Sequence, residues 1–382
     1  MTGGRVELRG MTWDHPRGYE PLVAASRQYA DAFGVEIVWD RRSLQAFADA
    51  PLTGLARSHD LVVLDHPHVG RIAVDGCLLP LPFPDPQDSA GVSIGGSLES
   101  YVRDGSLWAY PIDAACQMAV RRADYSGPVL TEWDRLAVGD PGSDIRMVTP
   151  LLPVDSCCLL MSLVASSGEV TLPRSEKEFV SARNGIRALE IIKSLYRAGP
   201  SEAVGWNPVR VLELLACSDE FDYSPCLFGY INYARDGFRP NRLIYVDVPV
   251  FRGMDMSRTI LGGAGIGVSA ATAHPEAATA FARWLSSEPV QSGIYLESEG
   301  QPAHRQTWLK AASDPRYAGF LDGGRRTLET AWTRPCDPWF LGFIDDLCDI
   351  FPSFLVRDRS EEGFLAAINR IYRHHCGLRS QS

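Results

Sequence analysis

The amino-acid sequence predicts an α/β fold that opens on a parallel sheet. Strand and helix patterns alternate over the first third of the 382-residue chain. Within that third, residues 61–64 form a continuous apolar run, LVVL, which is typical of a strand buried on both faces. With 45% hydrophobic and 22% charged residues, the chain can bury two or so compact cores, each in its own domain.

The opening elements follow from the spacing of the apolar side chains. Residues 4–10 are predicted to form a strand, and a helix follows in which apolar side chains recur at helical spacing until Gly34 stops it. A strand at 35–39 and a short helix at 43–55 come next, before the apolar strand at 61–64. This β-α-β-α-β order requires parallel strands joined by right-handed crossovers.

Longer helical patterns begin after about residue 125, and strand patterns return between them. The segment 221–233 combines aromatic residues with glycine, which indicates a strand followed by a loop. The elements predicted after residue 110 are a strand at 117–121, helices at 156–168, 176–198 and 207–217, strands at 243–247 and 266–269, a helix at 274–285 and a mostly helical tail at 324–374.

Charge and motif spacing exclude several classes of partner. The net charge of −10 opposes a nucleic-acid groove, which needs clustered basic side chains. No apolar run reaches the length of about 18 residues that spans a membrane, and no cysteine and histidine set has zinc-site spacing. The GGAGIG segment at 262–267 lacks the lysine of a phosphate-binding loop, so it is better interpreted as a hinge or a close backbone approach. We therefore expect no cofactor, metal, nucleic acid or membrane span.

Cysteine usage and the N-terminal segment bear on the cellular location. The nine cysteines are expected to be mostly free thiols, because a chain of this length needs no disulfide staples. Residues 1–18 lack the apolar segment of a secretory signal. As written, the chain is therefore expected in the cytoplasm, and a periplasmic or surface-anchored location would require a true start upstream.

Four segments, in the right order, resemble parts of the extracellular solute-binding proteins of ABC importers, family 1, the sugar type. One runs from His274 to Tyr295, carries an Ala-x-x-Phe-x-x-Trp-Leu core and is followed by GQPAH at 300–304. The other three resemble the first hinge crossing, the cleft strand of the second lobe and the glycine-rich return to the first lobe. They are WAYPIDA at 108–114, CLFGYINY at 226–233 and LGGAGIGVS at 261–269.

This resemblance implies an α/β, two-lobed periplasmic-binding-protein-like fold of type II, with a ligand cleft between the lobes. It implies a small-molecule ligand, and an ABC permease as the partner that receives it. The implied boundaries are 1–112 with 262–300 for the first lobe, 117–258 with 305–382 for the second, and hinges near 112–117, 248–262 and 300–305.

Candidate site residues follow from where ligands bind in such sheets. Ligands of open α/β sheets lie beyond the carboxyl ends of parallel strands. Aromatic faces would stack on a sugar or aromatic ring, and short polar groups would bind its hydroxyls. We expect Trp13 and Tyr230 to face each other across the cleft. The predicted ligand-binding residues are Trp13, Asp14, His15, Asp65, His66, Asp113, Cys116, Tyr230, Asn232, Tyr233 and Gly263.

Some of these residues also have a purely structural interpretation. Trp13 could be a core aromatic, since tryptophan is highly buried on average. Asp14 could cap the helix that begins near Pro16, and Asp65 could cap the next one. Capping and ligand contact are compatible, so both interpretations of the two carboxylates stay open.

Cys116 leaves an enzyme open as the alternative function. A more distant similarity to thiaminase I, which has the same type of fold and a cysteine nucleophile a few residues after a proline, implies that Cys116, after Pro111, attacks a substrate. The protein would then be a cytoplasmic transferase or hydrolase, with Asp222, Asp113 or His66 activating the thiol. The competing interpretation makes Cys116 apolar wall material. We favour the interpretation of Cys116 as wall material, because no glutamate or histidine lies at an obligatory spacing from it.

Overall fold

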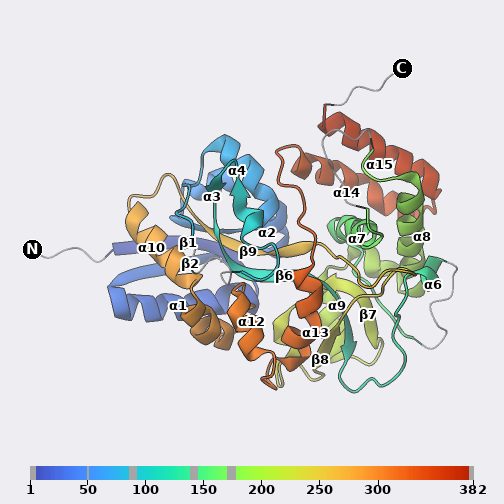
Figure 1. Ribbon diagram of the computed structural model, residues 1–382, viewed down its shortest axis with the longest axis horizontal. Coiled ribbons are helices and arrows are strands. Elements are labelled where there is room, and N and C mark those ends of the chain that lie inside the picture. Colours follow the sequence, from blue (N-terminus) through green and yellow to red (C-terminus); the bar gives the residue numbers. More distant parts are fainter. Residues whose placement is uncertain (1–5, 50, 86–92, 138–144, 170–177, 378–382) are drawn as a thin grey trace, which may run out of the picture.

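Two α/β lobes lie side by side and are joined by strands that pass through the middle of the molecule (Figure 1). This computed structural model describes residues 6–49, 51–85, 93–137, 145–169 and 178–377. In Figure 1, the lobe that contains the first strands is on the left, and the lobe that carries the C-terminal helices is on the right.

The first lobe opens with the alternation that the sequence predicts: β1 (Val6–Trp13), α1 (Pro16–Phe33), β2 (Val35–Arg42), α2 (Leu44–Asp49), α3 (Leu52–Ala56) and β3 (Leu61–Leu64). β1 lies between β2 and β3 and runs parallel to both. Gly34 ends α1 in the left-handed conformation, with φ at 72°. The single helix predicted at 43–55 is two helices, because Pro51 fits the start of the second and not the interior of a longer one.

One strand runs through both lobes. The strands of the central region are β6 (Tyr110–Arg122), β7 (Tyr223–Phe228), β8 (Leu243–Val246) and β9 (Leu261–Val268). β9 lies antiparallel between β3 and the first part of β6, whereas the last part of β6 pairs with β7 and β8. The result is a seven-stranded sheet in the order β2-β1-β3-β9-β6-β7, with β8 paired to β6.

The strand predicted at 117–121 and the crossing predicted at 112–117 are therefore parts of the same strand, β6. All residues from 110 to 120 are buried, so hydrogen bonding to neighbouring strands is the simplest way to satisfy this backbone. A register shift between Pro111 and Asp113 marks a bulge at this point instead of a loop.

Helices cover both faces of the second-lobe strands (Figure 1). Side chains of β6 alternate between the two cores, with Ala119 in one and Met118 and Val120 in the other. Helices on the Ala119 side are α7 (Pro153–Ser166), α8 (Ala182–Ala198), α14 (Phe340–Val356) and α15 (Glu361–His375). Helices on the other side are α9 (Pro208–Cys217), α12 (Arg305–Ala311) and α13 (Ala318–Glu329).

Shorter elements complete the chain. α4 (Val69–Asp75) and α10 (Pro275–Leu285) belong to the first lobe, and the apolar face of α10 packs into its core. The others are η1 (His66–His68), η2 (Glu99–Tyr101), β4 (Val102–Arg103), β5 (Ser106–Leu107), α6 (Asp134–Ala137), η3 (Ser201–Gly205), η4 (Ile231–Ala234), α11 (Glu288–Val290) and η5 (Gln291–Tyr295).

The segment between α13 and α14 returns to the first lobe before the chain finishes in the second. Arg334 binds Asp65 at the end of β3, and Asp337 lies 3.3 Å from a guanidinium nitrogen of Arg103. The sequence-based lobe boundaries place this segment wholly in the second lobe, so the contacts with the first lobe are new information from the structure.

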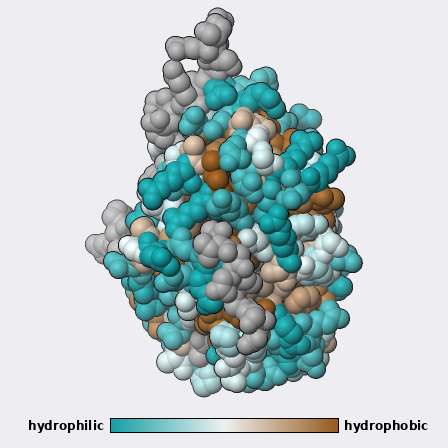
Figure 2. Space-filling view, turned by 90° about the vertical axis from the view of Figure 1, so that its right-hand side faces the viewer, coloured by the Kyte–Doolittle hydropathy of each residue, from teal (hydrophilic) through white to brown (hydrophobic). Residues whose placement is uncertain are grey.

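The outer end of the second lobe, seen in Figure 2, is mainly hydrophilic with small apolar spots between polar side chains. Across the described ranges, no helix is both long and apolar enough to cross a membrane.

Gly263 allows β9 and β6 to approach each other where they pass between the lobes. Its φ is 120°, a conformation that residues with a side chain rarely adopt. A Cβ at this position would lie 2.3 Å from the carbonyl oxygen of Asp113. The close backbone approach proposed for the glycine-rich segment is therefore present here, within a regular strand.

We expect Gly263→Ala to destabilise the protein. Strain at one such backbone position costs about 1–3 kcal/mol, and the steric overlap with Asp113 adds to that cost. Urea denaturation should show the loss as a lower free energy of unfolding. Gly54→Ala in α3 is the matched control, because a Cβ there meets nothing within 4 Å. Equal effects of the two substitutions would contradict the steric explanation.

Candidate ligand-binding site

A cavity of about 660 Å³ lies between the lobes, next to the crossing of β6 and β9. Small-molecule sites span about 300–1,000 Å³, so this volume suits a small ligand. The cavity wall combines residues of the first lobe, of the crossing strands and of the second lobe. They are Trp13, Arg17, Leu44, Phe47, Asp65, Asp113, Ala115, Leu152, Pro153, Val154, Asp155, Cys158, Gly205, Asn207, Pro208, Phe228, Tyr230, Gly262, Gly263, Ala264, Arg334, Ile344, Asp345, Cys348 and Asp349.

A buried ion pair joins the lobes at this wall. Arg17, in the first turn of α1, binds both carboxylate oxygens of Asp113 on β6, and its Nε lies 2.7 Å from Oδ2. The Nη1 of Arg17 also donates to the carbonyl of Gly229 in the second lobe at 3.0 Å. Burial alone would lower the pKa of Arg17, but the Asp113 carboxylate outweighs burial and raises that pKa, so the guanidinium stays charged.

A second ion pair lies at the end of β3. The Nη2 of Arg334 is 2.7 Å from Asp65 Oδ2, while Asp65 Oδ1 accepts the backbone N–H of His66 at 2.8 Å. Asp65 therefore caps η1 and also lines the cavity. Burial would raise the pKa of Asp65, but Arg334 and His66 outweigh burial and hold that pKa well below its usual range.

The second-lobe wall carries three carboxyl groups. Asp155, in the first turn of α7, is only 6% exposed, and within the described residues its carboxyl group has no hydrogen-bond or ion-pair partner. Burial raises the pKa of Asp155 to about 8. Asp345 and Asp349, one turn apart on α14, are exposed toward solvent and line the same cavity.

Aromatic side chains contribute to the wall from both lobes. Trp13 packs against Phe47 with ring centroids 5.0 Å apart, and both line the cavity. Tyr230 has the Arg17 guanidinium 4.5 Å from its ring centroid and the edge of the His15 ring beside it. Trp13 is 3% exposed and Tyr230 5%, so both are core residues as well as wall residues. The core interpretation of Trp13 and the cavity interpretation hold together.

Five of the predicted site residues line the cavity: Trp13, Asp65, Asp113, Tyr230 and Gly263. They come from the ends of β1 and β3, from β6 and β9, and from the segment after β7. These are the places where the strand-end rule and the family resemblance put them.

Asp14 and His15 do not line the cavity. The side chain of Asp14 is exposed and forms a 3.0 Å ion pair with Arg41, and the residue that caps α1 is His15 instead of Asp14. The His15 Nδ1 accepts the backbone N–H of Arg17 at 3.1 Å. Burial, aided by the charge of Arg17, lowers the pKa of His15 to about 3, which keeps its ring neutral and suited to accept this bond.

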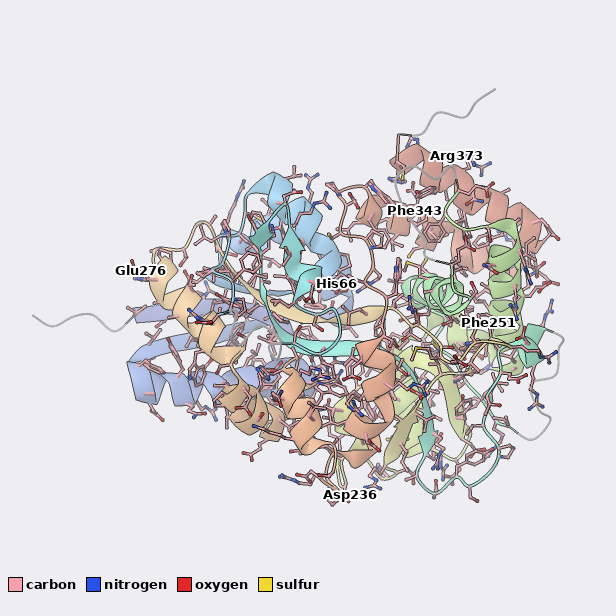
Figure 3. The ribbon with its side chains drawn as sticks, in the orientation of Figure 1. His66, Asp236, Phe251, Glu276, Phe343 and Arg373 are labelled. Atoms are coloured by element: carbon pink, nitrogen blue, oxygen red, sulfur yellow. The ribbon has the colours of Figure 1, made fainter. Side chains whose placement is uncertain are left out.

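Three other predicted contacts are turned away from the cavity. His66, labelled near the middle of Figure 3, is buried beside Asp65. The amide of Asn232 donates to the Glu299 carboxylate at 2.6 Å, and the hydroxyl of Tyr233 donates to Glu213 at the same distance. η4 carries both residues out of the strand direction after β7, so their nearness in sequence to Tyr230 does not bring them to the wall.

The alternative nucleophile and its base are also outside the cavity. Cys116 is 0% exposed, and burial raises the pKa of its thiol. Asp113 and Ala115 face the cavity from β6, so strand alternation turns Cys116 to the opposite side. Asp222 is bound through both carboxylate oxygens by Arg146, and it lies away from the lining residues. The placement of Cys116 in the cleft is therefore wrong.

Five charged wall residues were not predicted from the sequence: Arg17, Asp155, Arg334, Asp345 and Asp349. Arg17 lies one turn beyond the end of β1, so the strand-end rule could have included it if helix side chains had been counted. Asp155 follows a Leu-Pro helix start that marks a helix N-terminus but not what it faces. Arg334 is far from the other site residues in the chain, and no local pattern indicates its pairing with Asp65.

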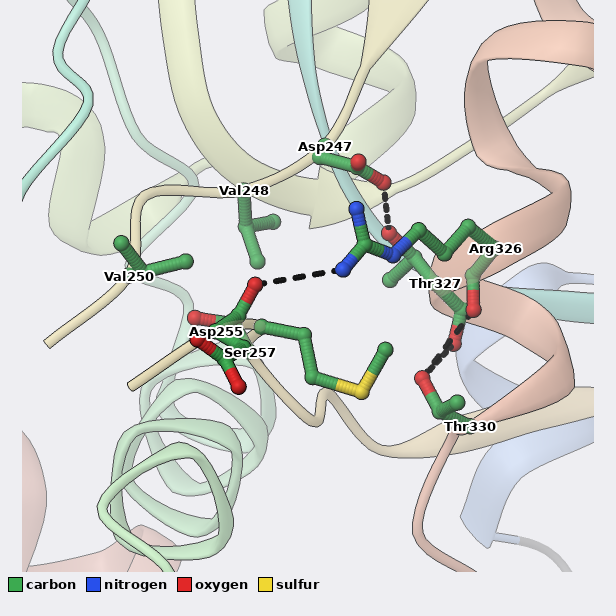
Figure 4. Close-up of a pocket in the computed structure, with 9 residues that line it drawn as sticks. Asp247, Val248, Val250, Asp255, Ser257, Arg326, Thr327 and Thr330 are labelled. Carbon is green, nitrogen blue, oxygen red and sulfur yellow. Dashed lines mark hydrogen bonds between the residues drawn. The ribbon is translucent and has the colours of Figure 1, made fainter. Parts of the chain in front are cut away.

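A second hollow, about 30 Å³ in volume, lies between the 247–257 segment and α13 (Figure 4). The Thr327 hydroxyl donates to Asp247 at 2.6 Å, and Arg326 donates to the Asp255 carbonyl at 3.2 Å. A hollow of this size holds about one or two water molecules, so it is no site for an organic ligand. In the part of the chain that the structure describes, no three His, Cys, Asp or Glu side chains gather closely enough to hold a metal ion.

The chain has the two-lobed α/β fold of the type II periplasmic binding proteins, as the sequence predicts. It is similar to a cyclo/maltodextrin-binding protein complexed with maltotetraose, at 13% identity and TM-score 0.74 over 100% of both chains. The GacH receptor of Streptomyces glaucescens GLA.O, solved unliganded and with acarbose, is similar at 14% identity and TM-score 0.78, over 99% of this chain and 100% of that chain. A solute-binding protein of an ABC transporter from Agrobacterium radiobacter K84, in complex with ribitol, is similar at 18% identity and TM-score 0.79, over 98% of this chain and 99% of that chain. No protein-family model and no curated protein matches the sequence.

The Arg17–Asp113 pair should show strong energetic coupling. Removing one member leaves a buried charge without its partner, which costs about 3–5 kcal/mol. We therefore expect Arg17→Met and Asp113→Asn each to lower the free energy of unfolding markedly, and the double variant to lose much less than the two losses added together. Denaturant unfolding of all four proteins measures this. If the loss in the double variant equals the sum of the two single losses, the Arg17–Asp113 pair is not the source of the destabilisation.

Cys116 should be among the last cysteines to react with an alkylating reagent. Its thiol is buried and its pKa is raised, whereas Cys217 is exposed. Brief treatment of the native protein with iodoacetamide, followed by peptide mapping, should label Cys217 and leave Cys116 unmodified. Selective labelling of Cys116 would contradict its buried environment and would favour the alternative hypothesis that Cys116 is a nucleophile.

Proposed function

We propose that this protein is a solute-binding protein, which closes its two lobes on a small polar ligand of sugar-like or aromatic-polar character. The observation that carries the proposal is the cavity of about 660 Å³, which lies between the lobes and is walled by residues of both. A ligand in that position contacts both lobes only when they are closed, so binding favours the closed arrangement.

The chemistry of the wall supports a polar ligand with flat or apolar faces. Trp13, Phe47, Phe228 and Tyr230 supply aromatic surface, and carboxyl groups supply acceptors for hydroxyl or amine hydrogens. The similar solved structures hold maltotetraose, acarbose and ribitol, all rich in hydroxyl groups. We extend that class, polyhydroxylated small molecules, to this chain.

An ABC permease is the proposed partner that receives the ligand. This part of the proposal requires the protein to act on the outer side of the membrane. We do not extend the proposal to a thiaminase-like reaction, because Cys116 is turned away from the cavity.

Ligand binding can be tested by filling the cavity. Gly205 lines the cavity, and a Cβ there meets nothing within 4 Å, so Gly205→Trp should occupy ligand space with little backbone strain. Gly54→Trp, at an equally open and exposed position in α3, is the matched control.

The readouts are thermal stabilisation and calorimetry with maltose, maltotetraose, acarbose and ribitol, and the radius of gyration with and without ligand. We expect at least one probe to raise the thermal midpoint and compact the wild type and the Gly54→Trp variant. Gly205→Trp should abolish both effects. Binding that survives in Gly205→Trp would place the ligand elsewhere, and no response to any probe would count against the proposal.

A further inference from the structure

The cavity wall has more acidic than basic groups. Its acidic lining residues are the aspartates 65, 113, 155, 345 and 349, its basic ones are the arginines 17 and 334, and Asp345 is engaged in a further interaction of its own. An excess of this kind in a low-dielectric cavity attracts positive charge and repels anions. The sign of the charge therefore says more about the ligand than the presence of polar groups does.

Neither arginine is free to neutralise the excess. Arg17 holds Asp113 through two nitrogens, and Arg334 holds Asp65 at 2.7 Å. Each pair leaves little net charge. Asp155 and Asp349, on the second-lobe wall, are the carboxyl groups that the two arginines do not balance, and the pKa of about 8 keeps Asp155 largely protonated at neutral pH while the cavity is empty.

Asp155 is the central group of that wall. It is more than nine-tenths buried, it lines the cavity, and within the described residues its carboxyl group has no partner. Buried carboxyl groups are normally hydrogen-bonded or paired, because an unpaired one is costly. A ligand that brings a positively charged donor to Asp155 would remove that cost, whereas a neutral hydroxyl would remove it only in part.

Asp345 and Asp349 extend the same wall toward solvent. They lie one turn apart on α14 and both line the cavity, and the exposed Asp349 adds negative charge to this part of the wall. The rings of Tyr230 and Phe47 already lie against the guanidinium groups of Arg17 and Arg42, so aromatic attraction for a cationic ligand would come from Trp13 and Phe228.

Two other ligand types fit the wall less well. A metal ion would need several ligands at bonding distance, and no group of three such side chains comes together in the described residues. An anion would need an available guanidinium. The Nε and Nη1 of Arg42 have no partner, but Arg42 does not line the cavity; the Nε of Arg334, which does line it, also has no partner, but the charge of Arg334 is balanced by Asp65 at 2.7 Å.

We propose that the ligand is an organic cation, a polyhydroxylated small molecule that carries a protonated amine, and that Asp155 receives the ammonium group. This inference rests on the proposed ligand-binding function and specifies the class of ligand. Asp349 adds longer-range attraction, and the aromatic side chains cover the carbon skeleton.

The test compares probes that differ in charge but little in shape. N-methyl-D-glucamine is the cationic counterpart of D-glucitol, and D-glucosamine is the cationic counterpart of D-glucose. Calorimetry at neutral pH should show the cationic member of at least one pair binding about tenfold or more tightly than the neutral member, which is the scale of one hydrogen bond to a charged group. A higher salt concentration should reduce the difference in affinity between the cationic and the neutral probe.

Asp155→Asn tests the assignment of the ammonium site. Asparagine keeps the size of the side chain and cannot be ionised, so the preference for the cationic probe should fall about tenfold while the thermal midpoint of the empty protein at neutral pH does not fall. Asp346→Asn is the matched control, because Asp346 neighbours Asp345 on α14 but binds His375 and does not line the cavity. Asp349→Asn is a second test. Because Asp349 is exposed, its substitution should not disturb folding, and we expect a smaller loss of the preference for the cationic probe than in Asp155→Asn.

Each outcome decides one point. Tighter binding of the cationic probes, lost in Asp155→Asn and kept in Asp346→Asn, supports the inference. Equal or tighter binding of the neutral probes overturns the cationic ligand and leaves the proposed function intact. A preference that persists in Asp155→Asn overturns the role of Asp155. No binding of either class contradicts the proposed function, and this inference with it.

Discussion

The buried pair between Arg17 and Asp113 fixes the geometry on which the cavity depends. One guanidinium contacts three parts of the molecule: the carboxylate on β6, the Gly229 carbonyl after β7, and the Tyr230 ring. A charge this deeply buried is tolerable only if its hydrogen bonds are satisfied. The start of α1 must therefore stay close to the crossing strand. Since Trp13 lies immediately before α1, this requirement also sets the position of the aromatic wall.

Strand β6 makes the two lobes one folded unit and still allows them to move. Its first part belongs to the first-lobe sheet and its last part to the second-lobe strands, so bending is confined to the region between them. The bulge near Pro111–Asp113 and the opposing Gly263 lie in that region. A few residues that absorb a backbone change are what hinge motion requires. The Arg334–Asp65 contact at the cavity wall adds a second connection between the segment before α14 and the end of β3.

Sequence patterns predicted the elements well where short-range physics determines them. The helical spacing and Gly34 define α1, and the apolar run at 61–64 defines a buried strand. The continuity of β6 could not be predicted, because Pro111 suggests an interruption and only long-range pairing shows otherwise. Site prediction worked for side chains at strand ends and failed for Asn232, which a single 3₁₀ turn redirects. Arg334 depends on a contact 269 residues away along the chain, for which one sequence contains no signal.

The unpaired Asp155 links the stability of the empty protein to the chemistry of its ligand. The pKa of an aspartate in an unfolded chain is about 3.9, whereas burial raises the pKa of Asp155 to about 8 in the folded protein. Between these values the folded state holds a proton that the unfolded state has lost, so through this group stability falls as pH rises from about 4 to about 8 and is then constant. An ammonium group beside Asp155 favours the carboxylate and reverses the shift, so a cationic ligand would displace this proton on binding. The empty wall thus holds a protonated carboxyl group without a partner, and a ligand that supplies a positively charged partner to its carboxylate would bind with release of that proton.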